Sequence, residues 1–413
     1  MRGHLLAPSC VVVALAVAIS ACGGGKTGGA NVNAGGTLTI YSSYPLQGDS
    51  RAQSEAMVNG ATMAMQESKG RAGRFRIKYV SLDDSTASAG KWDPGQTSAN
   101  ARHAAQDKSA IAYLGESNSG ATAVSLPILN QAGLLQISPD NTYVGLTRSE
   151  GADKGEPDKY YPTGKRTYGR VMPPDNVDAS AQVTYQKEQG CTKLYVLNDK
   201  EVYGKGVADL VASTAPTQGI KVLANEGLDV KASNYRSVAA KIKAAGADCM
   251  FYGATTANKT VQLWIDVNGT DPSIKLFGPA GMADTAFTSK IPAAAQSKTY
   301  LTTPTIDPKL YPPAGRAFFR RYKDKYGKEP ETYGIYGYEA MKVALLAIQN
   351  AGDKGNDRQA VIDAFFKIRD RHSVLGDYSI DANGDTTLSS YGGNTVKNGQ
   401  IIFNKVITVK THT

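Results

Sequence analysis

The stretch "GESNSGATAVSLPILNQAGLLQISPDNT", residues 115–142, carries the pattern that decides the fold. The apolar run that ends at its first glycine predicts a β-strand, and the segment closed by Gly133 has the composition of an amphipathic helix. The run "LLQISPD" then predicts a second strand. One strand–helix–strand unit of this length indicates two neighbouring parallel strands joined by a crossover helix.

Short polar side chains follow both predicted strands of this unit. Ser117, Asn118 and Ser119 come after the first strand, and Asp140 and Thr142 come after the second. Free backbone N–H groups and short hydroxyl side chains at strand ends suit a small anionic or zwitterionic ligand. Ordinary turns and helix N-caps use the same residue types, so the rest of the chain has to decide.

The same strand–helix alternation extends in both directions from this unit. It includes "TLTIYSSY" and "RFRIKYVSLDD" before it, and it resumes with "TKLYVLND", "IKVLANEGL", "CMFYGA" and "IKLFGPAG" after a polar stretch at Arg148–Pro174. Two helices are predicted at Pro313–Tyr326 and Tyr333–Ala351, and the tail reads as antiparallel strands with an Asn-Gly turn. The pattern predicts an α/β fold with two doubly wound parallel-sheet lobes.

Roughly 375 residues after the N-terminal segment exceed what one hydrophobic core usually serves, which also favours two lobes. Ligands of open α/β sheets bind beyond the carboxyl ends of the strands, so two such lobes would form a cleft. The sequence assigns 37–171 plus 306–373 to the first lobe and 172–305 plus 374–413 to the second. Three hinge crossings are predicted at Arg170–Pro174, Thr302–Asp307 and Ser373–Gly376.

The N-terminal residues have the pattern of an export signal. Arg2 precedes the apolar run "LLAPSCVVVALAVAIS", and "ISAC" ends it with small residues before Cys22. This pattern resembles the lipobox of bacterial lipoproteins, which implies a signal peptide over 1–22 and a lipid on Cys22; a plain signal peptide is the alternative. The Gly-rich segment 23–36 reads as a flexible tether. We therefore expect an extracytoplasmic protein that is lipid-anchored to the cell membrane.

Charge and cysteine content narrow the function classes. The net charge is 46 − 37 = +9, but the basic residues are dispersed and no nucleic-acid motif is present, so a nucleic-acid partner is not expected. Of the four cysteines, Cys191 and Cys249 remain in the body, each just before a predicted strand. If those strands are parallel neighbours, a disulfide is geometrically reasonable; two buried thiols are the alternative.

Catalytic and metal-binding patterns are incomplete. "GESNSG" has Ser119 where a nucleophile elbow needs glycine, and "ASAGKW" lacks the upstream glycine of a phosphate-binding loop. "DANGD" begins like a calcium loop, but Gly392 stands at the twelfth position, so a hairpin turn is the better interpretation. No Cys/His set has zinc spacing. The sequence therefore predicts no enzyme activity, no metal and no cofactor.

At "GESNSGATAVSLPILNQAGLLQISPDNTYVGLT" the chain resembles the branched-chain amino-acid (Leu/Ile/Val) binding family, the type I periplasmic binding proteins of ABC importers. The resemblance includes "NGATMAM", "YVSLDDS", "NDKEVYGKG", "LFGPAG", "YGYEAM" and "SVLGDYSIDANGDT", and it runs from Thr37 to the end. It implies the type I periplasmic-binding-protein fold and capture of a small solute between two lobes.

The resemblance also implies roles for single residues. It places the ligand carboxylate on Ser119 and Thr142, with a backbone carbonyl of Asp140 near the amino group. Tyr203 would close over the ligand from the second lobe, and Gln53 and Tyr333 would line the side-chain pocket. Two further positions complete the predicted site: Thr255, where the family often has an aromatic residue, and Ala280.

Ala280 departs from the family pattern. Members that bind amino acids usually supply a glutamate at this position of the "GP-Glu-G" turn, whereas this chain reads "FGPAG". A buried ammonium without an anionic partner would be costly. Either another acid, Asp140 or Glu116, binds the ammonium, or the ligand lacks an α-amino group.

The sequence thus predicts a monomeric solute-binding protein that delivers a small polar molecule, an amino acid or a related carboxylate or amide, to ABC permease subunits in the membrane. A receptor that reports its ligand to a membrane signalling partner is the alternative function.

Overall fold

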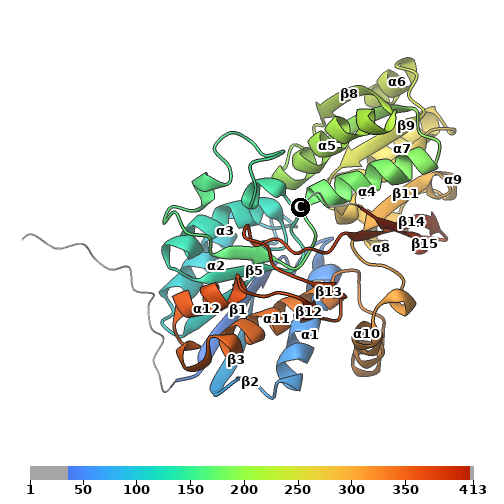
Figure 1. Cartoon of the computed structure of the whole chain (residues 1–413). Helices are drawn as coiled ribbons and strands as arrows, with labels where there is room; N and C mark the ends of the chain where they lie inside the picture. The colour runs from blue at the N-terminus through green and yellow to red at the C-terminus, as the bar shows by residue number, and fades with distance from the viewer. Residues whose placement is uncertain (1–35, 410–413) are drawn as a thin grey trace, which may run out of the picture.

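The computed structural model describes residues 36–409, which form two α/β lobes (Figure 1). The predicted signal peptide, Cys22 and all but the last residue of the predicted tether lie outside the described residues. Each lobe has one twisted sheet with helices on both sides. In Figure 1 the first lobe carries the blue and cyan elements and the second lobe the green and yellow ones. No helix within residues 36–409 has the length and apolar content needed to cross a membrane.

The first lobe is built on a six-stranded sheet. Its strands are parallel except for β2, which pairs with β3 in the antiparallel sense. In spatial order the strands are β2 (Arg71–Ala72), β3 (Phe75–Asp83), β1 (Leu38–Tyr44), β4 (Ala110–Leu114), β5 (Leu135–Ser138) and β6 (Tyr168–Arg170). All residues of β1, β4 and β5 are buried, as expected for central strands that helices cover on both faces.

The second lobe has a seven-stranded sheet. Five of its strands are parallel, and the last two of the chain, which form a hairpin, join the edge in the antiparallel sense. In spatial order the strands are β15 (Gln400–Thr408), β14 (Ser390–Lys397), β11 (Thr299–Thr303), β10 (Lys275–Gly278), β9 (Cys249–Gly253), β7 (Lys193–Asn198) and β8 (Lys221–Gly227). The β14–β15 turn is Asn398–Gly399, both with positive φ, which confirms the predicted Asn-Gly hairpin.

Helices cover the two sheets. Those of the first lobe are α1 (Arg51–Glu67), α2 (Pro94–Gln106), α3 (Ser119–Gln131), α10 (Pro313–Tyr326), α11 (Gly334–Asn350) and α12 (Arg358–Phe365). Those of the second are α4 (Asp175–Glu188), α5 (Val202–Thr214), α6 (Arg236–Ala244), α7 (Thr260–Thr270), α8 (Thr285–Thr288) and α9 (Ala293–Gln296). Short 3₁₀ helices are η1 (Val144–Leu146), η2 (Asp158–Tyr160), η3 (Ala215–Gln218), η4 (Ala280–Met282), η5 (Pro308–Leu310) and η6 (Gly352–Lys354). A small two-stranded sheet, β12 (Arg371–His372) with β13 (Asp377–Tyr378), lies beside the first lobe.

Helices α1 and α11 pack closely against one another in the core of the first lobe. Gly337 makes this approach possible, because a Cβ atom there would lie 2.3 Å from the backbone oxygen of Met57. The contact fixes the start of α1 against the start of α11. These two helix starts carry Gln53 and Tyr333, so the packing places two of the predicted site residues.

The chain passes between the lobes three times. The first passage follows β6 and precedes α4, and the second follows β11 and precedes η5, close to the predicted Arg170–Pro174 and Thr302–Asp307. The third is later in the chain than the predicted Ser373–Gly376. Val374, Tyr378 and Ile380 belong to the hydrophobic core of the first lobe, and β14 enters the second sheet only at Ser390.

The segment 374–385, which the sequence assigned to the second lobe, therefore packs against the first lobe. Arg170 N donates a hydrogen bond of 2.9 Å to Gly384 O, which ties the segment to the end of β6. The loop Asp381–Asp385 is a tight turn, since Asp381 N donates to Asp385 O at 2.8 Å, and this confirms the hairpin interpretation of "DANGD". The glycine in Ser373–Gly376 suggested an earlier passage between the lobes, but the apolar side chains around it are buried in the first lobe and keep the segment there.

Candidate functional site

The predicted ligand-binding residues all line one pocket between the two lobes. About 610 Å³ of space lies within it, including its open mouth. The first lobe contributes Gln53, Asn118, Ser119, Asp140, Thr142 and Tyr333, and the second contributes Tyr203, Thr255 and Ala280. Ser117 of the first polar cluster and Asn141 of the second also line the pocket. Further lining residues, which the sequence did not single out, are Ser50, Ser54, Met172, Thr256, Gly281 and Asp284.

Strand ends bring the first-lobe residues together. Strands β4 and β5 are parallel neighbours, so the turns that follow them meet at one edge of the sheet. The first turn leads into α3 with Asn118 and Ser119, and the second turn carries Asp140 and Thr142. This arrangement answers the question raised by residues 115–142: their two polar clusters form one wall of a single pocket.

The N-terminus of α3 offers donors to an anion. Asn118 is the N-cap residue, but its side chain makes no capping hydrogen bond, and its Oδ1 is buried without a partner. The first-turn N–H groups of a helix have no intrahelical acceptor and carry a partial positive charge. Ser119 Oγ accepts a bond of 3.3 Å from Tyr143 N, which leaves its hydroxyl proton available to donate. Thr142 Oγ1, also buried without a partner, adds a second hydroxyl to this end.

Asp140 offers an acceptor to a cation beside this anion-binding wall. Ser117 Oγ donates a bond of 2.6 Å to Asp140 Oδ2, whereas Asp140 Oδ1 is buried without a partner. Burial raises the pKa of Asp140 well above its usual value; the Ser117 bond offsets part of this effect and the charge of Glu116 adds to it. No Lys or Arg side chain lines the pocket within the described part of the chain. A carboxylate in these surroundings is stabilised by a cationic ligand group.

Two further buried carboxyl groups, Glu116 after β4 and Asp84 after β3, interact electrostatically with Asp140. Burial raises the pKa of Glu116 to about 7, and it raises that of Asp84 well above its usual value, with the nearby charge of Glu116 adding to the effect. Tyr113 Oη donates a bond of 2.9 Å to Glu116 Oε1. The structure buries Asp84 completely and leaves Asp83 partly exposed.

Second-lobe residues close the pocket from the opposite side. Gly281 N donates a bond of 3.0 Å to Tyr203 Oη, and a Cβ atom on Gly281 would lie 2.6 Å from the Tyr203 ring. Tyr333 Oη of the first lobe donates a bond of 2.8 Å to the backbone oxygen of Ala280 in the second. The two lobes therefore contact one another directly across the pocket, which is the closed arrangement of a cleft.

A charged contact joins the lobes beside the pocket. Lys91 of the first lobe forms an ion pair with Glu201 of the second, and Lys91 Nζ also donates a bond of 3.2 Å to Asn258 Oδ1. Trp92 Nε1 lies 3.5 Å from Glu201 Oε2. The Trp92 ring packs on Gly120 of α3, where a Cβ atom would come within 2.8 Å of it. These residues are far apart in sequence, so no local pattern could have paired them.

Asp284 is the most informative residue that the sequence analysis missed. It follows Ala280 by four residues and lines the same pocket, with 3% of its surface exposed. Asp284 Oδ1 accepts a bond of 2.6 Å from Ala286 N at the start of α8. The local signal was an acid just beyond the "FGPAG" turn, whereas the predicted segment ended at the last glycine of that turn.

A buried ion cluster holds the turn after β5 from behind. Arg170, fully buried at the end of β6, donates from Nε to Asp385 Oδ1 at 2.8 Å and from Nη1 to Tyr143 O at 2.9 Å. Arg148 Nε reaches the other oxygen of Asp385 at 2.6 Å. Although burial acts to raise the pKa of Asp385, the charges of the two arginines lower it below its usual value.

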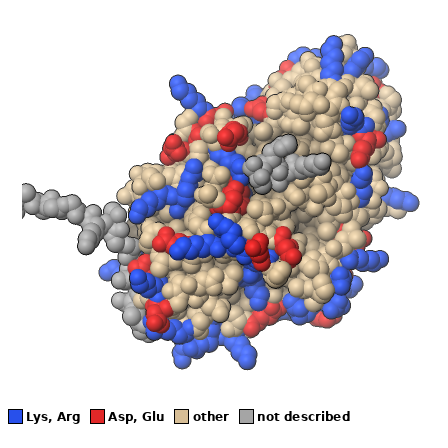
Figure 2. Space-filling model, in the orientation of Figure 1, with Lys and Arg blue, Asp and Glu red and all other residues tan. Residues whose placement is uncertain are grey.

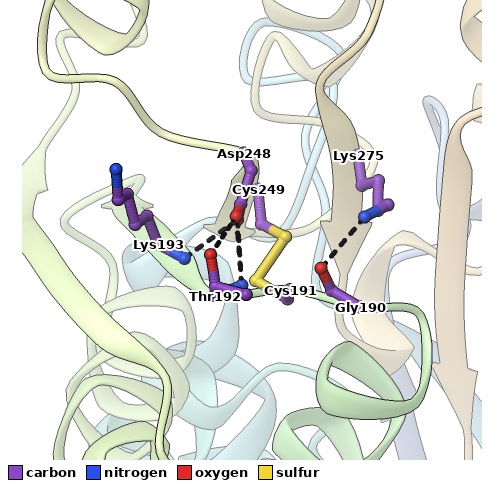
Figure 3. Close-up of a disulfide and its surroundings, with 7 residues drawn as sticks. All are labelled: Gly190, Cys191, Thr192, Lys193, Asp248, Cys249 and Lys275. Atoms are coloured by element: carbon purple, nitrogen blue, oxygen red, sulfur yellow. Dashed lines mark hydrogen bonds between the residues drawn. A yellow bond between two sulfur atoms is a disulfide. The ribbon is translucent and has the colours of Figure 1, made fainter.

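Cys191 and Cys249 are joined by a disulfide, with their Cα atoms 5.8 Å apart (Figure 3). Strands β7 and β9 are parallel neighbours, the arrangement on which the sequence argument for this bond depended. Asp248 accepts a bond of 2.9 Å from Lys193 N beside the bridge. Both cysteines lie at the amino ends of their strands, so the bond is at the sheet edge opposite to the pocket. Among the described residues, Cys191, Asp248 and Cys249 form the group of acid and thiol side chains that lie close enough together to hold a metal ion. The two sulfur atoms of this group are bonded to each other.

Residues 37–399 match the family model described as periplasmic binding protein. Among curated proteins, the chain is 25% identical over 375 residues to an amino acid binding protein of Pseudomonas aeruginosa, covering 88% of this chain and 91% of that protein. It is 27% identical over 279 residues to a Leu/Ile/Val-binding protein homolog of Brucella suis, covering 67% and 70%.

Solved structures share the fold. A leucine binding protein of Thermotoga maritima superimposes with a TM-score of 0.78 at 21% identity, covering 90% of this chain and 99% of that one. A solute binding protein of R. palustris in complex with benzoate gives 0.74 at 17% identity, covering 91% and 98%. These likenesses confirm the expected two-lobed fold.

Proposed function

The chain belongs to the periplasmic binding protein family, and on that premise we propose that its pocket binds a zwitterionic solute of the α-amino-acid type for an ABC importer. Proteins of this family are substrate-binding proteins that act outside the cytoplasm. The proposal rests on one observation: the same pocket offers donors to an anionic group and an acceptor to a cationic group. Free donors at the start of α3 lie beside an unpartnered oxygen of Asp140.

The ligand carboxylate is assigned to the α3 end of the pocket. The first-turn N–H groups, the Ser119 hydroxyl and the unpartnered Thr142 hydroxyl would donate to it. Hydrogen bonds to a charged group contribute about 1.5–3 kcal/mol each. The α-ammonium is assigned to Asp140, which would take the role that Ala280 leaves open. Benzoate in a relative with this fold is the reason to test acids without an amine as well.

We further propose that lobe closure is the working step, with no bond made or broken. The three passages between the lobes would act as the hinge, and the Tyr333–Ala280 and Lys91–Glu201 contacts would form on closure. The proposal extends to the N-terminus: the sequence "ISAC" supports lipid attachment at Cys22, with the Gly-rich segment as tether to the membrane. The relatives named for amino acids support an importer as partner.

The test is ligand binding by the purified protein, followed by thermal unfolding and calorimetry. The panel contains L-amino acids, the matching 2-oxo acids, the deaminated carboxylic acids and the matching amines without a carboxylate. A ligand at 100 times its Kd adds about 2.7 kcal/mol to the free energy of unfolding. We expect a raised Tm only with compounds that carry both charged groups.

A raised Tm with deaminated acids and none with amino acids would contradict the assignment of Asp140 to an ammonium. Asp140→Asn provides the matched variant, since it keeps the size of the side chain and removes its charge. In the proposed site this variant binds amino acids about 10- to 150-fold more weakly and keeps its folded structure.

A further inference from the structure

The pocket has a second polar end, away from Asp140. It is formed by Ser50, Gln53 and Ser54 at the start of α1 together with Asp284 of the second lobe, and we call these four residues the distal end. Helix α1 follows β1, whereas Asp140 follows β5, and β4 lies between these two strands. Two strand spacings separate the two ends by roughly 10 Å. A ligand whose α-carbon groups are held at Asp140 and α3 would direct its side chain toward the distal end.

The charges around Asp284 are mostly negative. Burial raises the pKa of Asp284, and the neighbouring charge of Asp49 adds to the effect. Glu331 lies near enough for Asp284 to raise its pKa as well, after the larger effect of burial. Two cations lie nearby: Lys290, which is half exposed and lies 3.5 Å from Asp49, and Lys328, whose charge acts to lower the pKa of Glu331. The side chain of Gln53 is the polar first-lobe group that faces Asp284.

Ser54 provides an independent sign that this end receives a ligand. Its side chain is 1% exposed and lines the pocket, and its Oγ has no hydrogen-bond partner among the described residues. Buried hydroxyl groups in native proteins are almost always bonded, so an orphan hydroxyl at a pocket wall indicates a partner supplied from the pocket. The distal end is therefore polar and incompletely satisfied, which does not suit a purely aliphatic side chain.

We propose that the ligand carries a second cationic group, at the end of its side chain, that binds beside Asp284 and Ser54. The favoured class is a basic α-amino acid, with an ammonium or guanidinium group placed between the lobes. This inference rests on the proposed function and adds to it the chemistry of the side chain. Tyr333 lines the pocket and interacts electrostatically with both Asp140 and Asp284.

The same aspartate has a structural role, which the experiment must separate from the charge. Asp284 is the N-cap of α8, and asparagine caps helices about as well as aspartate. Asp284→Asn therefore keeps the cap and removes the charge. Asp357→Asn is the matched control, because Asp357 caps α12 through Ala360 N at 2.9 Å and does not line the pocket.

The measurement is isothermal titration of the full chain with pairs that differ in charge at nearly constant shape. The pairs are L-arginine with L-citrulline and L-lysine with L-norleucine, with L-ornithine and L-2,4-diaminobutyrate testing length and L-leucine as the aliphatic reference. We expect at least one cationic member to bind about tenfold or more tightly than its neutral partner. Asp284→Asn should abolish this preference and change the affinity for the neutral partner by less than about twofold; Asp357→Asn should change neither.

Two results would overturn the inference, and they differ in what they say of the proposed function. If L-leucine or the neutral partners bind more tightly than the cationic ligands, or if Asp284→Asn leaves the charge preference intact, the cationic subsite is wrong while amino-acid binding stands. If no α-amino acid of any charge binds and deaminated acids do, the proposed function fails and the inference fails with it.

Discussion

Two groups of buried carboxylates lie at the carboxyl edge of the first sheet, and they differ in their partners. Asp385 is held by Arg170 and Arg148 near the first passage between the lobes, and its pKa is lowered. Asp140 and Glu116 lie by the pocket without a basic partner, and their pKa values are raised. The same type of side chain thus stabilises the fold in one place and is left for a ligand in the other. The presence of an arginine decides between the two roles.

The largest effect should come from breaking the paired group. Asp385→Asn leaves Arg170 buried and without its counter-charge, and removing one partner of a buried pair costs about 3–5 kcal/mol. We expect urea unfolding to show a loss of this size. Because Arg170 Nη1 also holds Tyr143 O beside the pocket, ligand affinity should fall in the same variant. A loss below about 1 kcal/mol would show that the buried ion cluster contributes little to the stability of the fold.

The second prediction concerns the unpaired group. Asp140→Asn removes a buried charge without a basic partner, so the unliganded protein should be as stable as before or more stable. Affinity for an amino-acid ligand should fall by about 1.5–3 kcal/mol, roughly 10- to 150-fold. Calorimetry and urea unfolding of the same variant measure both quantities. A clear loss of stability in the unliganded variant would show that Asp140 stabilises the fold, as Asp385 does.

The pH dependence of stability should separate the groups without any mutation. Asp175 and Asp178 at the start of α4 are buried, and burial raises their pKa values to about 8 and about 6, beside about 7 for Glu116. Between their unfolded values near 4 and these folded values, the native state binds more protons than the unfolded state. Stability therefore falls as pH rises through this window, by about 1.4 kcal/mol per pH unit for each group that lies between its unfolded and folded pKa.

Urea unfolding at four pH values checks the slope, and Asp175→Asn should flatten it. Asp385 contributes nothing to this slope, because its lowered pKa keeps it ionised across the window. A protein whose stability increased from pH 5 to pH 8 would contradict the raised pKa values of Asp175, Asp178 and Glu116.

The smallest effect is expected from the ion pair between Lys91 and Glu201, which is partly exposed. Lys91 and Glu201 are about one-third and one-quarter exposed, and such pairs are worth about 0–1 kcal/mol. Glu201→Gln should weaken ligand binding by a few-fold at low salt and by less at high salt, since the pair is broken when the lobes open. Equal losses at both salt concentrations would exclude an ionic contribution to closure.

The sequence predicted the fold well where an element can be recognised from a short run of neighbouring residues. Continuous apolar strands and the Asn398–Gly399 turn read directly from the chain, because each depends on neighbours in sequence. The third passage was misplaced, because Ser373–Gly376 looks like a hinge while the apolar residues after it pack under the first lobe. Strand β6 and helix α12 were not predicted, the first because it is three residues long within a polar stretch.

The site was predictable to the extent that strand ends define it. The parallel order of β4 and β5 brings Ser119, Asp140 and Thr142 together, and the family resemblance supplied their expected roles. Asp284 was not found, because an acid just before a short helix reads as a capping residue until its surroundings are known. Cross-lobe contacts such as that of Lys91 with Glu201 have no local signal, since both partners are set by the tertiary fold.

The position of Trp92 has a practical consequence. The chain has two tryptophans, and they lie in different kinds of surroundings. Trp264 is fully buried in the core of the second lobe, where its Nε1 donates to Thr299 Oγ1 at 3.0 Å. Trp92 is partly exposed and contacts Glu201 across the boundary between the lobes. The molecule therefore carries one intrinsic fluorophore at the boundary between the lobes and a second in the buried core, so the proposed closure could be followed in real time without a label.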